Sequence, residues 1–268
     1  MLVPFHTSGT KVPLYFIHGI AGVMTLGRFL AQSLGSDQPL YAINANAIDR
    51  RETTVKDMAQ MYVEEILNTK PSGPVFIAGM CAGGLAALEV ARELQNRGRK
   101  VGPVILADPP GVPQGLVPQN QTVDAQDPVV ASNLYQQVRG QLLDFASQPD
   151  NEMPFAVDDE QQVHLATLTG VKSLVAFCRH VPEIFTGTAV AILSPRRAAN
   201  FFHPQMPWVK ILPQPSMVFV LPHNHRELFQ SGRHDLSRVL KFILDEAMNF
   251  GTSAGGVEKV QEFAHELD

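Results

Sequence analysis

The segment at residues 79–84, with the sequence Gly-Met-Cys-Ala-Gly-Gly, constrains the fold of this chain more than any other feature. It follows a short apolar run at 74–78 and precedes a strong helix former at 85–94, so we expect a strand, a tight turn and a helix in that order. A residue at the tip of such a turn has a strained backbone, and the residues two before it and two after it must lack side chains that would collide. The glycines of the segment meet this condition on both sides of Cys81. The pattern predicts a nucleophile elbow with cysteine where serine is usual, and the simpler alternative is a buried cysteine in a glycine-rich turn.

The size and charge of the chain exclude several classes of protein. With 268 residues, of which 45% are hydrophobic and 18% charged, it can bury the core of one larger α/β domain. The formal net charge of −5 gives no electrostatic reason to expect nucleic acid or an anionic membrane surface as a partner. No apolar run approaches the length of a membrane span.

The two cysteines and the start of the sequence indicate a reducing compartment. Cys81 and Cys178 lie far apart and suggest no disulfide framework, and residues 1–6 contain no basic segment followed by an apolar core. We therefore expect a cytoplasmic protein, in which a catalytic thiol stays usable.

Apolar runs of strand length alternate with helical patterns along most of the chain. The expected helices span 25–34, 54–67 and 85–94. Such alternation predicts the α/β class, a mostly parallel sheet flanked by helices, with reactive groups at the carboxyl ends of the strands. The expected strands span 14–17, 40–43, 74–78, 104–107, 189–193 and 217–220.

A long stretch that begins near residue 111 interrupts this alternation. It is rich in Gln, Asp and Pro, and only 133–145 and 161–168 have helical patterns. So long an excursion inside a compact domain is more often functional than idle, so we interpret residues 111–185 as a helical lid over the carboxyl edge of the sheet. An ordinary surface excursion is the alternative.

The C-terminal end of the chain differs in composition from the rest. We assign residues 1–250 to a single domain, followed by a linker and an amphipathic tail at 251–268. The linker at 251–256 is made of Gly, Ser, Ala and Thr, and the apolar residues beyond it are spaced for one face of a helix.

A cysteine nucleophile requires a base, and two histidines follow the last expected strand. We choose His225, because it directly precedes the apolar pair Leu228-Phe229, which can pack and hold the loop. His223 is the alternative. No third ligand accompanies this pair with a familiar spacing, so we expect no metal site.

The position of the acid is less usual. The carboxylate most often follows the penultimate strand in this architecture, but here that strand continues as Ser-Pro-Arg-Arg at 194–197. Asp108 directly follows the strand at 104–107, where it could cap a turn or orient the histidine. The missing carboxylate at 194–197 favours the catalytic interpretation.

These features together resemble the thioesterase domains of nonribosomal peptide and polyketide synthases, which have the α/β-hydrolase fold. The resemblance covers nearly the whole chain, from Leu2 to the helix that ends near Phe250. In that family the acid follows the strand after the elbow helix, which supports Asp108. The usual serine is replaced by Cys81. The motifs that carry the resemblance are the elbow at 79–84, the run at 98–101, Asp108, Trp208 ahead of the last strand and His225 after it.

The resemblance implies a reaction and a partner. A carrier protein would present an acyl chain on phosphopantetheine, and Cys81, His225 and Asp108 would form the catalytic triad, with no further cofactor. The backbone N–H groups of Ile20 and Ala82 would bind the oxyanion. The acyl-enzyme would then be released by water, by an amine or by an internal nucleophile.

Three other functions remain as alternatives at this stage. A stand-alone editing thioesterase that acts in trans would use the same residues. A non-catalytic acyl-binding module on the hydrolase scaffold would require a broken triad, and no triad position is vacant. A dinucleotide-binding fold is the weakest alternative, because the motif at 79–84 lacks the second glycine of that fingerprint and does not follow the first strand.

Overall fold

The computed structural model describes residues 2–45, 54–110, 128–147, 153, 155–201, 207–212, 217–246 and 260–262. Within these ranges an eight-stranded sheet has the order β1-β3-β2-β4-β5-β6-β7-β8. Only β1 is antiparallel to its neighbour β3, and every other pair is parallel. The predicted mostly parallel sheet is therefore confirmed. The strands are β1 Leu2–His6, β2 Leu14–Ile17, β3 Leu40–Ile43, β4 Phe76–Met80, β5 Val104–Ala107, β6 Ala189–Leu193, β7 Met217–Val220 and β8 Val260–Glu262.

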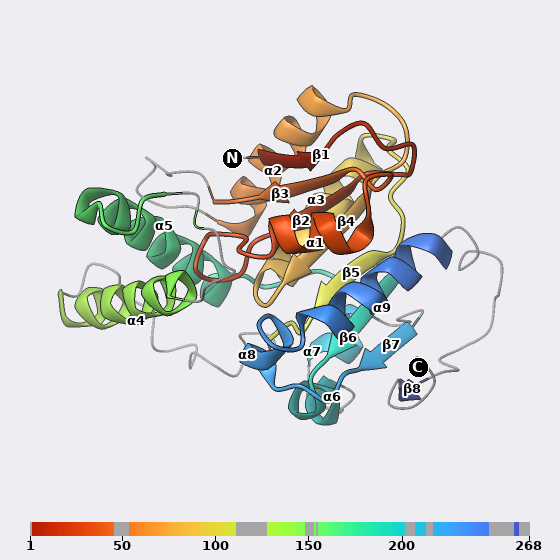
Figure 1. Cartoon of the computed structure of the whole chain (residues 1–268). Coiled ribbons are helices and arrows are strands. Elements are labelled where there is room, and N and C mark those ends of the chain that lie inside the picture. Colours follow the sequence, from red (N-terminus) through yellow and green to blue (C-terminus); the bar gives the residue numbers. More distant parts are fainter. Residues whose placement is uncertain are drawn as a thin grey trace.

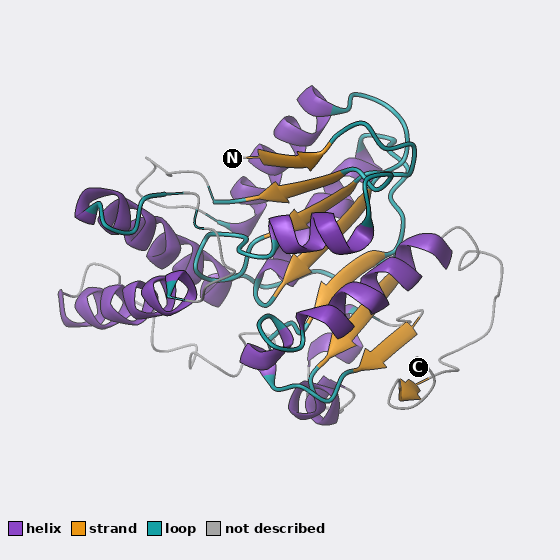
Figure 2. Cartoon of the chain, viewed as in Figure 1, coloured by secondary structure: helices purple, strands orange, loops and turns teal. Residues whose placement is uncertain are grey.

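Helices cover both faces of the sheet (Figures 1 and 2). Helices α1, Gly27–Leu34, and α9, Arg233–Glu246, bury apolar side chains against one face. Helices α2, Val55–Thr69, and α3, Gly83–Asn96, do so against the other face. Three short helices follow the ends of β6 and β7, namely α6 Pro195–Phe201, α7 Pro207–Ile211 and α8 His225–Leu228.

Strand β2 shows why the central strands read as unbroken apolar runs. Leu14 and Phe16 belong to the core under α1 and α9, whereas Tyr15 and Ile17 belong to the core under α2 and α3. All four side chains are fully buried. A strand covered on both faces has no polar side to alternate with, and each such buried side chain contributes about 1.5–3 kcal/mol.

The strand before the elbow is displaced from its predicted position. Strand β4 begins at Phe76 and continues to Met80, directly before Cys81, whereas the prediction was 74–78. Pro74 has no N–H to donate, and Val75 makes only an isolated bridge to Val101. Cys81, the predicted nucleophile, thus directly follows the last residue of the strand.

The predicted lid contains two helices, both longer than their sequence patterns. They are α4, Pro128–Ala146, and α5, Glu160–Arg179, and they lie together at one side of the sheet in Figure 1. Val138 and Leu142 of α4 form a small core of their own with Ala21, which follows β2. Residues 111–127 of the predicted lid lie outside the described residues.

The C-terminal tail differs from its predicted helical pattern where it is described. Residues 260–262 form β8, which pairs in parallel with β7. An edge strand has free N–H and C=O groups, and pairing with them outweighs the weak helical periodicity of so short a segment. The predicted linker at 251–256 lies outside the described residues.

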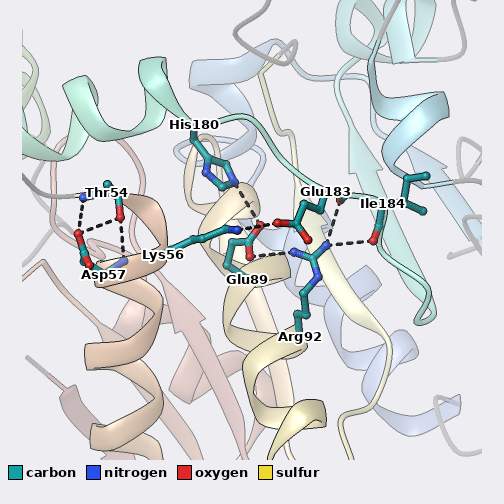
Figure 3. A network of polar contacts seen from close by, with 8 residues as sticks. All are labelled: Thr54, Lys56, Asp57, Glu89, Arg92, His180, Glu183 and Ile184. Carbon is teal, nitrogen blue, oxygen red and sulfur yellow. Dashed lines mark hydrogen bonds and ion pairs between the residues drawn. The ribbon is translucent and has the colours of Figure 1, made fainter.

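A polar network joins the end of the lid to the elbow helix (Figure 3). Glu89 of α3 is buried, accepts a hydrogen bond from Arg92 at 2.8 Å, and lies 3.3 Å from Nε2 of His180, which follows α5. Arg92 also donates to the carbonyl oxygens of Glu183 and Ile184 at 3.0 and 3.1 Å. Burial raises the pKa of Glu89, but His180 and Arg92 outweigh it and the pKa lies below its ordinary value. The charge of Glu89 therefore holds the segment after α5 against α3.

We expect Glu89→Gln to lower the free energy of unfolding by about 1–3 kcal/mol, because it removes the charged acceptor from a buried network. A carboxyl with a depressed folded-state pKa stabilises the fold above its unfolded pKa, and this contribution is lost as pH falls through the folded pKa. The parent and the variant should therefore differ in urea unfolding at pH 7 and converge in acid. Glu93→Gln, one turn further along α3 and partly exposed, is the control and should change stability little. An equal difference at both pH values would contradict this assignment.

Candidate active site

Cys81 occupies the sharp turn between β4 and α3. Its φ of +51° lies in the left-handed region, which β-carbon-bearing residues adopt at a cost of about 1–3 kcal/mol. A Cβ at Gly79 would lie 2.2 Å from the carbonyl oxygen of Gly83, and a Cβ at Gly83 would lie 2.0 Å from the carbonyl oxygen of His18. The two glycines therefore allow the turn to close, as the steric argument from the sequence required.

Asp108 follows β5 and is fully buried, also with a positive φ, of +48°. Its Oδ1 accepts the backbone N–H of Ser194 at 2.6 Å, and its Oδ2 accepts a hydrogen bond from Nδ1 of His225 at 2.6 Å. The turn after Asp108 is held in place because the indole N–H of Trp208 donates to the carbonyl oxygen of Pro110 at 2.7 Å. The carboxylate is thus fixed on both oxygens.

His225 is the first residue of α8 and is held by its neighbours. The side chain of Asn224 caps the helix by accepting the N–H groups of Arg226 and Glu227. The ring of His225 packs edge-on against Phe229, with 5.3 Å between the ring centroids. Burial lowers the pKa of His225, but hydrogen bonds with Asp108 and Cys81 outweigh this effect and raise the pKa to about 9.

The other histidine of this loop has a different partner. Nε2 of His223 lies 2.7 Å from Oδ2 of Asp235, on α9. The two candidate histidines therefore contact two different carboxylates, and only His225 lies beside Asp108 and Cys81.

The thiol of Cys81 is set up to ionise. Burial raises its pKa, but the hydrogen bond and charge of His225, the backbone N–H of Ala82 and the charge of Arg197 together lower the pKa below its ordinary value. A depressed thiol pKa beside a raised imidazole pKa favours a thiolate–imidazolium pair. This arrangement provides a nucleophile and a proton donor in contact.

The loop after β2 brings Ile20 close to Cys81. The N–H of Gly22 donates to the carbonyl oxygen of Gly19 at 3.1 Å and closes a turn that contains Ile20. A Cβ at Gly19 would lie only 3.4 Å from Cβ of Cys81. Ala82, the N-cap residue of α3, follows Cys81 directly. The two residues predicted for the oxyanion hole therefore belong to the two segments that meet at Cys81.

His18 supports this loop in a way that the sequence did not reveal. Its Nδ1 donates to the carbonyl oxygen of Gly19 at 2.5 Å, and its Nε2 accepts the hydroxyl of Tyr62 at 2.7 Å, since a carbonyl oxygen can only accept. Burial lowers the pKa of His18 to about 4, so the ring stays neutral. The sequence predicted a role for the backbone N–H of Ile20, and the imidazole of His18 holds the backbone directly before that residue. Tyr62 lies on the buried face of α2, within the predicted helix 54–67, but no local pattern in the sequence indicates its contact with His18.

A cavity of about 260 Å³ opens at Cys81 and His225. Its wall is mainly apolar, and α4 of the lid contributes Gln141, Asp144 and Phe145. Asp144 pairs with Arg226 at 2.6 Å, so an ion pair joins the lid to the residue after His225. Phe145 is the apolar side chain that the described part of the lid contributes to this wall, whereas Leu165 and Leu168 of α5 are exposed to solvent. The remaining lining residues are Gly19, Ile20, Ala21, Val23, Thr25, Met80, Arg226 and Phe229.

Three further observations concern the described part of the chain alone. Both cysteines are free thiols, and burial raises the pKa of Cys178. Within the described ranges no group of three His, Cys, Asp or Glu side chains could hold a metal ion. None of the helices there has the length and apolar character needed to cross a bilayer.

Comparisons of the sequence with known proteins agree with the fold. The family model described as thioesterase domain matches residues 12–156, a stretch longer than half of the chain. A dimodular nonribosomal peptide synthase of Bacillus subtilis (strain 168) is 31% identical over 134 residues, 49% of this chain and 6% of that protein. Chondramide synthase cmdD of Chondromyces crocatus is 39% identical over 113 residues, 41% of this chain and 3% of that protein. The chain thus spans only a small part of the length of these relatives.

Solved structures share the fold at low sequence identity. The NocB thioesterase domain of the nocardicin cluster has a TM-score of 0.66 and 20% identity, covering 92% of this chain and 98% of its own. The surfactin thioesterase domain has a TM-score of 0.65 and 17% identity, covering 95% and 96%. These likenesses establish the α/β-hydrolase fold. With the family model matching more than half of its length, the chain belongs to the thioesterase domain family, whose members are hydrolases that act on thioesters.

Proposed function

We propose that this domain releases acyl or peptidyl chains from a carrier protein through a covalent acyl-enzyme on Cys81. The observation that supports this most is the position of His225, hydrogen-bonded at 2.6 Å to a buried Asp108 and in contact with the Cys81 thiol, at the end of a cavity. A nucleophile, a base and an orienting acid in this order are what acyl transfer requires.

The first half of the reaction forms the acyl-enzyme. The Cys81 thiolate attacks the thioester carbonyl carbon, and the N–H groups of Ile20 and Ala82 stabilise the oxyanion of the tetrahedral intermediate. When the intermediate collapses, the bond to the carrier sulfur breaks and the leaving thiolate takes the proton of the His225 imidazolium. Asp108 fixes the tautomer of His225 and stabilises its charged form.

The second half releases the chain. Neutral His225 accepts a proton from water, from an amine or from a nucleophile on the chain itself, which then attacks the acyl carbonyl. The Cys81 thiolate leaves, and the thiolate–imidazolium pair is restored. The acyl-enzyme is a thioester like the incoming substrate, so it retains the reactivity that an oxoester on serine would lose. Release by an amine or an internal nucleophile is therefore easier here than in a serine enzyme.

We further propose a carrier protein as the partner. One relative with similar sequence is a nonribosomal peptide synthase, and a carrier-borne phosphopantetheine arm would bring the thioester to Cys81. The domain then needs no resident cofactor. An editing thioesterase that acts in trans would use the same residues on a different substrate.

Intact-mass measurement after incubation with an acyl thioester tests the proposal directly. An adduct of the acyl mass on Cys81 is expected. A chain that binds the thioester without forming an adduct or hydrolysing it would be a non-catalytic binding module, and the proposal would fail. Turnover should also be compared between aminoacyl chains and complete peptidyl chains on a carrier. Preference for aminoacyl chains would indicate editing, and preference for peptidyl chains would indicate product release.

Asp108→Asn is expected to lower kcat by a factor of about 10³–10⁴ without unfolding the protein. Asparagine keeps an oxygen for the Ser194 N–H, but its amide nitrogen faces His225 and stabilises the wrong tautomer. Turnover of an acyl thioester and thermal unfolding should be measured together. Parent-like activity would place the acid elsewhere.

His225→Ala should abolish turnover, whereas His223→Ala should retain it within a few-fold, because His223 contacts Asp235 and not the nucleophile. The two variants remove the same side chain two residues apart, so each is the control of the other. The reverse result would transfer the role of base to His223.

Cys81→Ser should shift the products of one carrier-bound substrate toward hydrolysis or toward a stalled oxoester. The ratio of amide or cyclic product to free acid measures the shift, since only the thioester form keeps the intermediate activated. An unchanged ratio would show that the geometry of the pocket selects the acceptor. Failure of the variant to acylate would mean that His225 cannot activate a hydroxyl.

A further inference from the structure

Arg197 lies beside the site, after the strand where a carboxylate is usual in this architecture. It belongs to α6, and its Nε is 4.0 Å from Oδ2 of Asp108. This oxygen is the one that accepts the hydrogen bond from His225. The Asp108 side chain is fully buried, and only 32% of the Arg197 side chain is exposed. The guanidinium therefore acts on the carboxylate through little solvent.

The charges of the reactive form explain why a cation is useful there. Ionised Asp108, an imidazolium on His225 and a thiolate on Cys81 sum to one negative charge, and the Asp108 carboxylate is fully buried, although 40% of the His225 side chain is exposed. A buried net charge is costly unless an opposite charge compensates for it. Arg197 brings the sum to zero.

The other charged groups around the cavity do not supply this compensation. Asp144 of α4 and Arg226 of α8 pair with each other at 2.6 Å. His223 is paired with Asp235, and His18 is buried with a pKa of about 4, so it carries no charge. The cationic side chain that lies near Asp108, among the described residues that surround the site, is Arg197.

We propose that Arg197 is a positioning residue that holds the Asp108 carboxylate toward His225 and supplies the positive charge that keeps Cys81 ionised. This inference rests on the proposed function, in which Cys81 is the nucleophile. At 4.0 Å Arg197 makes no direct hydrogen bond to Asp108, so its effect is mainly electrostatic. The direction agrees with the lowered pKa of Cys81, to which the charge of Arg197 contributes.

The chain offers a matched control in the adjacent residue. Arg196 is exposed on the same helix. Arg197→Gln and Arg196→Gln change the net charge of the protein equally. A difference between them therefore reports on position and not on total charge.

The test is the pH dependence of alkylation of Cys81 by iodoacetamide, followed by peptide mass mapping so that Cys178 is counted separately. The reagent is uncharged, so loss of an arginine does not alter its attraction to the site. For R197Q we expect the profile to move to higher pH, with alkylation at the acidic side slower by roughly threefold to tenfold, since one pKa unit is a tenfold change in thiolate. R197K should keep most of the parent profile, and R196Q should superimpose on it.

Several outcomes would overturn the proposal. One is an R197Q profile that superimposes on the parent profile, and another is an equal shift of the R196Q profile. If R197Q combines an unchanged profile with a raised KM for an acyl thioester, Arg197 is a substrate contact. Thermal unfolding of each variant controls for folding, and R197M replaces R197Q if the latter does not fold. Alkylation requires no acyl substrate, so failure of the acyl-enzyme test would leave this measurement valid.

Discussion

The structure of the site depends on one close contact between two backbone segments, the start of α3 at Gly83 and the residue directly after β2, His18. A Cβ at Gly83 would lie 2.0 Å from the carbonyl oxygen of His18, so β2 and the start of α3 approach each other more closely than side chains allow. This approach sets Cys81 at φ +51° and brings the loop that contains Ile20 against it. A larger residue at position 83 would push the segment that leads to Ile20 away from Cys81 and Ala82, so the predicted oxyanion donor on that loop would be lost while the strain stays local.

The buried charge of Asp108 is the second requirement. Serine in such a site stays neutral until attack, whereas the lowered pKa of Cys81 beside the raised pKa of His225 favours a thiolate–imidazolium pair, and a site in that form holds three charges in place of one. The hydrogen bond from Ser194 N–H, the hydrogen bond from His225 and the nearby Arg197 all compensate for the carboxylate. The replacement of serine by cysteine thus makes the electrostatic surroundings of the acid more important than they would be in a serine enzyme.

Local patterns predicted the parts of the fold that local physics determines. The strands at 14–17, 40–43 and 104–107 have the predicted bounds, because strands covered on both faces must be apolar throughout. The tight turn at Cys81 and the position of His225 after the last strand could also be predicted, because residues close to them in the sequence determine both. Contacts between segments that are far apart in the chain produce no local pattern in the sequence, so they could not be predicted. The bond between His18 and Tyr62 and the network around Glu89 join residues far apart in the sequence, and the strand at 260–262 forms because the edge of β7 accepts it.

The lid is joined to both sides of the site by contacts of unequal strength. On one side Asp144 pairs with Arg226, but both side chains are exposed, and such pairs contribute only about 0–1 kcal/mol. On the other side Gly170 of α5 packs so closely that a Cβ there would lie 2.6 Å from Val138 and 3.1 Å from the carbonyl oxygen of Ala21. This packing is apolar and buried, so it dominates the attachment of the lid. Because Ala21 follows Ile20, the position of α5 is transmitted to the loop beside the nucleophile, whereas the contact next to His225 can open at little cost.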